Sequence, residues 1–193
     1  DYTFPADPHE AVESDFAALD ALYAGRKAYY GDFHAHSNSG GTSDGHTTPE
    51  AWLEAMPALH MDFIGLMDHR QERHMYLDSF DSDHFIYGSE PAGLWLEPEL
   101  DCHYLMLFQD RGGLERVLNR FPDVFEFEGG TEGHFKYIRI ERDRFLQVRD
   151  AVLEEGGAFV NAHPKQQIQS EDLADFYFGD GTAIEVIYTC KYD

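Results

Sequence analysis

The sequence predicts an α/β fold, a single domain over residues 1–193 in which strands and helices alternate around a parallel sheet or barrel. Apolar segments typical of strands alternate with helix-like segments along nearly the whole chain, and no repeat or linker divides it. Histidines and acids recur where the strand-like segments end, which is the edge where function collects in such folds. A length of 193 residues suits one domain with a substantial core.

The elements follow from the spacing of apolar residues. A helical extension is expected within residues 1–28, with its apolar residues packed on the rest of the chain. Thr48-Pro49 marks the start of a second helix, which Pro57 is expected to end. Residues 124–141 predict a hairpin insertion. The remaining strands are expected over 31–36, 62–67, 84–89, 103–108, 158–161 and 183–188, and further helices over 114–121, 144–155 and 171–177.

Composition limits the partners. A formal net charge of −23 argues against nucleic acid or an anionic membrane. No apolar run is long enough to span a membrane, and two isolated cysteines suit a reducing compartment, so we expect a cytoplasmic protein. The sequence begins at Asp1 without a methionine, so we expect something upstream, and a secreted form with a removed leader stays open. The oligomeric state is not predicted.

The segment Gly31-Asp32-Phe33-His34-Ala35-His36 carries the first chemical signal. Residues two apart on a strand point to the same face, so His34 and His36 are expected to project side by side toward one ion. The loop rich in Gly and Ser that follows can bring Asp44 back toward this pair, with His46 as a substitute.

Further candidate ligands follow other predicted strands. His69, Glu90 and His163 lie at or just beyond the ends of predicted strands, whereas His103 precedes its apolar run and is expected to reach the same rim. Imidazoles and carboxylates without thiolates suit Zn, Mn or Fe, and they exceed what one tetrahedral ion needs, so we expect two or three divalent metal ions. Such a site lowers the pKa of bound water and clamps the oxygens of a displacement, which favours hydrolysis, most often of a phosphate ester.

Together these motifs resemble the PHP (polymerase and histidinol phosphatase) superfamily, and the opening segment resembles its stand-alone, carbaryl-hydrolase-like branch. The resemblance spans residues 30–188 and implies a distorted (β/α)7 TIM-like barrel holding two or three divalent metals. The segments that carry it are Gly31–His36, Ser43-Asp44-Gly45, Thr48-Pro49-Glu50, Asp68-His69, Gly88-Ser89-Glu90, His103 and Asn161-Ala162-His163-Pro164.

By position, the resemblance implies seven metal ligands, namely His34, His36, Asp44, His69, Glu90, His103 and His163. The expected catalytic residues among them are Asp44, His69, Glu90 and His163, with Glu90 bridging two ions. The residues expected to orient ligands are Asp32, Asp68 and Asn161. Arg70 directly follows His69, and Lys165 lies two residues after His163; both are expected to bind a substrate anion, with a surface salt bridge as the alternative for either.

The resemblance has two departures. The loop between His36 and Asp44 is longer than the family's usual form, which makes His46 the alternative to Asp44. The family closes its site with an Asp-x-His pair near the C-terminus, and none follows His163 here, so we expect an incomplete barrel and site unless the native chain continues. The leading interpretation is a phosphoesterase of a small phosphorylated molecule, with metal-bound hydroxide as nucleophile. The alternatives are a carboxylic or carbamic ester hydrolase on the same metals, and a non-catalytic PHP-like module.

Overall fold

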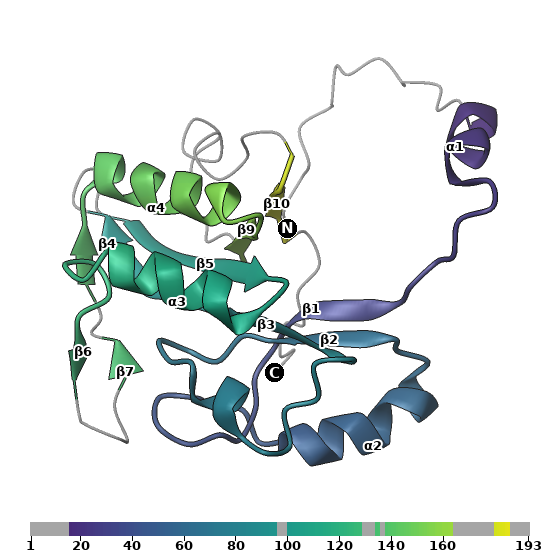
Figure 1. Cartoon of the computed structure of the whole chain (residues 1–193), viewed down its shortest axis with the longest axis horizontal. Coiled ribbons are helices and arrows are strands. Elements are labelled where there is room, and N and C mark those ends of the chain that lie inside the picture. The colour runs from purple at the N-terminus through teal and green to yellow at the C-terminus, as the bar shows by residue number, and fades with distance from the viewer. Residues whose placement is uncertain (1–15, 96–99, 129–133, 136–137, 164–179, 186–193) are drawn as a thin grey trace, which may run out of the picture.

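The computed structural model describes residues 16–95, 100–128, 134–135, 138–163 and 180–185. They form a mixed α/β structure around one curled sheet (Figure 1). The strands of that sheet are β1 Gly31–Ala35, β2 Phe63–Leu66, β3 Phe85–Ser89, β4 Ala92–Trp95, β5 Leu100–Phe108, β8 Ile138–Ile140, β9 Ala158–Ala162 and β10 Thr182–Ile184. Of these, β4 was not expected from the sequence.

The curled part of the sheet runs in the order β1-β2-β3-β5-β9-β10. Neighbours are parallel except at β5, which is antiparallel to both β3 and β9. The predicted all-parallel arrangement is therefore wrong at β5. Within the described residues β1 and β10 are the outer strands of the curl and do not pair with each other, as in an incomplete α/β barrel.

The helices differ from their predicted bounds mainly at their ends. They are α1 Phe16–Tyr23, α2 Pro49–Leu59, α3 Arg111–Arg120 and α4 Arg142–Glu154, with a 3₁₀ turn, η1, over Arg73–Tyr76. The Thr48 side chain caps α2 by accepting from the Ala51 N–H, and the helix runs past Pro57 to end at His60, whose φ of 54° is left-handed. The predicted helix over 171–177 lies outside the described residues.

The N-terminal helix does not pack as the sequence suggested. Figure 1 shows α1 standing apart from the sheet at the end of an extended segment. Its apolar side chains Phe16, Leu22 and Tyr23 are exposed.

The segment 124–141 is a hairpin only in part. β6 Phe127–Glu128 and β7 His134–Phe135 pair antiparallel, as predicted. β8, in contrast, leaves this hairpin and joins the main sheet parallel to β4. The segment is extended as its sequence pattern predicts, but its last strand pairs with β4 and not within the hairpin.

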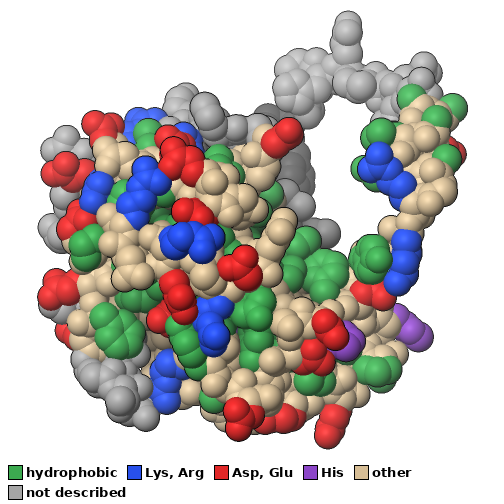
Figure 2. Space-filling model, in the orientation of Figure 1, with side chains coloured by type: hydrophobic (Ala, Val, Ile, Leu, Met, Phe, Trp, Pro, Cys, Tyr) green, Lys and Arg blue, Asp and Glu red, His purple; other side chains and the backbone are tan. Residues whose placement is uncertain are grey.

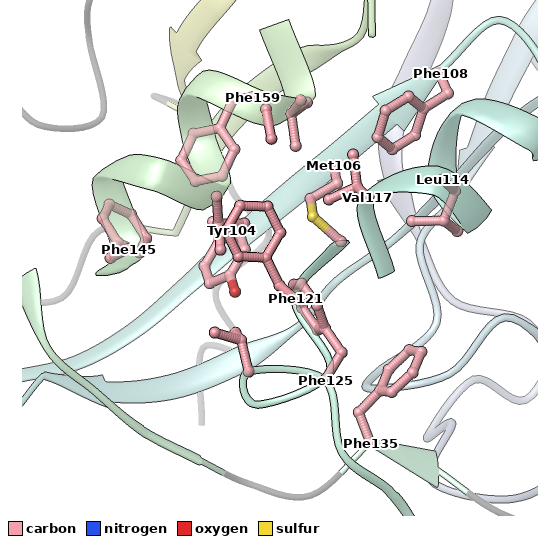
Figure 3. Close-up of a cluster of buried hydrophobic side chains, with 14 of the residues drawn as sticks. Tyr104, Met106, Phe108, Leu114, Val117, Phe121, Phe125, Phe135, Phe145 and Phe159 are labelled. Carbon is pink, nitrogen blue, oxygen red and sulfur yellow. The ribbon is translucent and has the colours of Figure 1, made fainter. Parts of the chain in front are cut away.

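The largest core cluster fixes β5 between two helices and the rest of the sheet. Alternate residues of β5, including Tyr104, Met106 and Phe108, face α3 and α4 (Figure 3). Intervening residues such as Leu105 and Leu107 pack on the other face. Fully burying one such side chain contributes about 1.5–3 kcal/mol, so β5 is held firmly from both sides.

The charged surface is mixed on the face shown in Figure 2, where Asp and Glu side chains spread between Lys and Arg side chains. Several form ion pairs, for example Arg144 with Asp123 at 2.5 Å and Arg116 with Glu155 at 2.6 Å. Among the described residues, no helix has the length and apolar character needed to cross a membrane.

Candidate metal centre

Six side chains converge at one end of the curled sheet, and we call them the histidine–glutamate cluster: His34, His36, His69, Glu90, His103 and His163. Each lies on a strand of the curl or within a few residues of its end. The sequence-predicted ligands from five separate segments are thus brought together around one point.

Glu90 is the centre of the cluster and is fully buried. Its Oε2 atom lies 3.1 Å from His34 Nε2, 3.2 Å from His36 Nε2 and 3.0 Å from His69 Nδ1. Its Oε1 atom lies 2.9 Å from both His103 Nδ1 and His163 Nε2. The two oxygens of one carboxylate therefore serve two separate groups of imidazoles, which is the arrangement a bridging ligand needs.

The backbone ladder between β2 and β3 continues past the strands to place Glu90 beside His69. The two residues form an isolated parallel bridge, in which the Glu90 N–H donates to Asp68 O and the Arg70 N–H donates to Glu90 O. Arg70 then takes a left-handed φ of 52°, and His163 one of 30°. Non-glycine residues in this region are strained, and such strain gathers at functional sites.

His103 reaches the cluster because β5 is antiparallel. The start of β5 lies at the same edge as the carboxyl ends of its neighbours, and His103 is paired in register with Ala162 of β9. This brings its ring within 4.9 Å of the His163 ring, centroid to centroid. The sequence predicts His103 at this rim without a physical reason for it. The antiparallel direction of β5 is that reason.

Asp44 approaches the cluster from its open side. Its Oδ1 atom lies 3.1 Å from His36 Nδ1, without the geometry of a hydrogen bond, and its Oδ2 atom lies 3.7 Å from His69 Nε2. The Asp44 side chain is 71% exposed. His46, the proposed substitute, is exposed and belongs to none of the groups of described side chains spaced to share an ion.

Asp68 supports the loop that carries Asp44, and does not contact the ligand rings. This buried carboxylate accepts hydrogen bonds from the N–H and hydroxyl of Ser37, at 2.6 and 2.7 Å, and from the hydroxyl of Ser39. Burial alone would raise the pKa of Asp68, but His74, 3.3 Å away, and these donors hold it well below its ordinary range. No motif in the sequence surrounds His74.

The other two residues expected to orient ligands differ from each other. Asp32 accepts a hydrogen bond from the backbone N–H of His34 at 2.9 Å, so it supports that ligand's backbone. Asn161 is buried on β9, and its side chain has no hydrogen-bond partner in the structure described. The predicted orienting role of Asn161 therefore finds no contact.

Of the two expected anion-binding residues, only Arg70 can be placed. Its guanidinium donates to the carbonyl of Phe135 in β7 at 3.4 Å, and the Phe135 N–H donates to the Arg70 carbonyl at 2.6 Å. Arg70 thereby joins the rim of the cluster to the β6–β7 hairpin. Lys165 lies outside the described residues.

Glu185 is a site residue that sequence reasoning did not single out. It directly follows β10, and its Oε2 atom lies 3.2 Å from His34 Nδ1 and 2.6 Å from the backbone N of His163. The available signal was one acid inside the apolar run Ile184-Glu185-Val186-Ile187 at the end of a predicted strand.

The charge distribution of the cluster favours binding of a cation. Burial alone would raise the pKa of Glu90, but hydrogen bonds from the surrounding imidazoles hold it far below its ordinary value. Burial would lower the pKa of His34, yet its hydrogen bonds to Glu185 and Glu90 and their charges raise it to about 10. In the same way, Glu90 raises the pKa of His69 against the effect of burial. Positive charge is therefore strongly stabilised around Glu90.

The spacing of these atoms fits a metal ion. His34 Nε2, His36 Nε2 and Glu90 Oε2 form a triangle with sides of 3.0, 3.1 and 3.2 Å. Bonds of about 2.0–2.1 Å to a tetrahedral ion separate its ligand atoms by about 3.3 Å, close to that triangle. In three groups of described side chains the ligand atoms lie within 4.8 Å of one another: His34, His36 and Glu90; His36, Asp44 and His69; and His69, Glu90 and His103. The donor set suits divalent ions such as Zn, Mn or Fe.

Comparisons with known proteins show limited likeness. No family model matches the sequence, and no curated protein does. Among solved structures, one described as a metal-dependent phosphoesterase from Bifidobacterium adolescentis is 14% identical, with a TM-score of 0.44 over 81% of this chain and 77% of that one. An amidohydrolase from Chromobacterium violaceum, solved with sulfate and no metal, is 15% identical, with a TM-score of 0.48 over 80% and 75%. The assignment of a metal centre rests on the geometry alone.

Proposed function

We propose that this protein is a metal-dependent hydrolase of a small phosphate ester, with two or three divalent ions held by the histidine–glutamate cluster and Asp44. The observation that carries the proposal is Glu90, whose two buried oxygens each face a separate group of imidazoles. Ions held in this way lower the pKa of bound water and stabilise the charge of a phosphoryl group.

The residues of the chain divide the remaining tasks. His34, His36, His69, His103 and His163 would hold the ions, and Glu90, whose carboxylate contacts all five rings, would bridge them. Asp44 stands at the mouth, where its exposed carboxylate is the first ligand that an entering substrate meets. Arg70 lies next to His69, and the N–H groups of its guanidinium not directed at Phe135 can bind a phosphate oxygen.

A phosphate ester fits this charge pattern better than a neutral ester does. The chain carries a net charge of −23, so an anionic substrate needs a local centre of positive charge to bind. Two divalent ions with Arg70 outweigh the carboxylates of Glu90, Asp44 and Glu185 and provide that centre.

The test combines metal content with turnover. We expect purified protein to contain two or more equivalents of Zn, Mn or Fe by mass spectrometry, and to hydrolyse a generic phosphomonoester. The double variant His34→Ala, His36→Ala should lose both metal and activity while keeping its far-UV circular dichroism. Turnover of a carboxylic ester alone would overturn the substrate class. Absence of bound metal after reconstitution would favour the non-catalytic module.

A further inference from the structure

We propose that Glu185 is a positioning residue of the metal centre, which holds the His34 ring with Nε2 directed at Glu90 and ties it to the turn that carries His163. This inference rests on the proposed metal-binding function and adds a residue to it. Three features of the structure support it in turn.

The first feature is the orientation of the His34 ring. Its Nδ1 atom faces Glu185 Oε2 at 3.2 Å, while its Nε2 atom faces Glu90 Oε2 at 3.1 Å. An ionised carboxylate only accepts hydrogen bonds, so a neutral His34 must carry its proton on Nδ1 when it is bonded to Glu185. The lone pair of Nε2 is then free for a cation on the Glu90 side. A carboxylate behind a ligating histidine fixes the tautomer and raises its basicity.

The second feature is that one oxygen atom serves two ligands. Glu185 Oε2 also accepts a hydrogen bond from the backbone N–H of His163 at 2.6 Å. His34 belongs to β1 and His163 follows β9, so the two ligands come from strands that do not pair within the described sheet. Burial would raise the pKa of Glu185, but these two contacts lower it, which keeps the carboxylate ionised.

The third feature is the space beside the pair. A cavity of about 400 Å³ is lined by residues of both outer strands, including Gly31 and His34 from β1 and Ala183 and Ile184 from β10. Glu185 lines it as well. The contact between Glu185 and His34 therefore lies at the wall of this cavity and joins the ends of the two outer strands. On its other side the His34 ring stacks on the His163 ring, with 5.5 Å between centroids, so the carboxylate and the neighbouring imidazole together hold its orientation.

The experiment compares Zn²⁺ binding by the full chain and three variants, using competition with a chelator. Glu185→Ala removes the acceptor, and we expect zinc affinity to fall about 10- to 100-fold. Glu185→Gln keeps a carbonyl oxygen for both N–H groups and loses only the charge, so its affinity should fall less. Glu155→Ala, which breaks a surface ion pair with Arg116, is the matched control and should bind as the wild type does.

A second readout separates positioning from general damage to the fold. In the zinc-loaded wild type, ¹⁵N NMR of the imidazoles should show the Nδ1–H of His34 hydrogen-bonded and protected from exchange, and in zinc-loaded Glu185→Ala that proton should shift upfield and exchange faster with water. Equal zinc affinity in wild type and Glu185→Ala would overturn the inference and leave the metal centre standing. Failure of the wild type to bind zinc would overturn the proposed function itself.

Discussion

At the scale of single residues, burial distinguishes the two carboxylates expected to bind metal. Glu90 is fully buried among imidazoles, whereas the Asp44 side chain is 71% exposed. Glu90→Gln keeps the shape but removes the charge that two groups of histidines share, so we expect metal affinity to fall by more than about 100-fold. Asp44→Asn should lower the metal content by no more than the ion held between His36, Asp44 and His69. Metal content after dialysis measures both.

The comparison of these two variants has a clear contrary outcome. If Glu90→Gln retained the full metal content and Asp44→Asn lost it, the metal centre would lie at the exposed Asp44 and not around the buried Glu90. Thermal melting of the metal-free proteins serves as the control, because a buried substitution must first be shown to fold.

The residues that gather in the cluster could be predicted from the sequence, whereas the contacts of Glu185 and His74 could not. His69 and Glu90 stand where apolar runs stop, and that pattern is local. Glu185 supports a histidine 151 positions away in the chain, a relation that exists only once β1 and β10 both flank the same gap. The contact of His74 with Asp68 cannot be predicted for the same reason. Asp68 meets His74 and the Ser37 hydroxyl only once the chain has folded.

At the scale of elements, strand existence could be predicted but strand direction could not. Apolar alternation marks β5 equally well in either direction, and only its neighbours β3 and β9 make it antiparallel. The same limit applies to β8, whose partner is β4 and not the adjoining hairpin. Direction matters for function here, because it brings His103 to the rim.

A substitution at Gly88 measures how closely β3 packs against β5 and Met67. A Cβ atom at this position would lie 2.3 Å from the carbonyl oxygen of Met106 and 2.5 Å from the sulfur of Met67. Because one contact is backbone of β5, we expect Gly88→Ala to lower the free energy of unfolding by about 1–3 kcal/mol, measured by urea denaturation. Glu90 lies two residues on, so metal affinity should fall as well.

Gly112→Ala is the control for this substitution. Its Cβ atom would meet only the ends of the Asp110 and Arg116 side chains, at 3.0 Å, and alanine favours the helix α3. Its stability should match or exceed that of the wild type. Equal stability of Gly88→Ala would mean that β3 and β5 can separate without cost.

At the scale of the whole molecule, protons and metal compete for His34, which links stability to pH. The pKa of His34 is about 10 against an ordinary 6.5, so metal-free protein keeps this stabilisation below pH 6.5 and loses it as pH rises toward 10. Metal needs the neutral imidazole, so its affinity should rise with pH, about tenfold per unit for one displaced proton.

Between pH 6.5 and about 8.5, the Tm of EDTA-treated protein should fall while the Tm gain from zinc grows. His34→Gln should weaken both trends and leave the part due to His69, whose pKa is also raised. His84→Ala, which replaces an exposed residue paired with Asp81, should keep both trends in full. A zinc-induced gain in Tm that shrank as pH rose would show that this proton is not the one displaced.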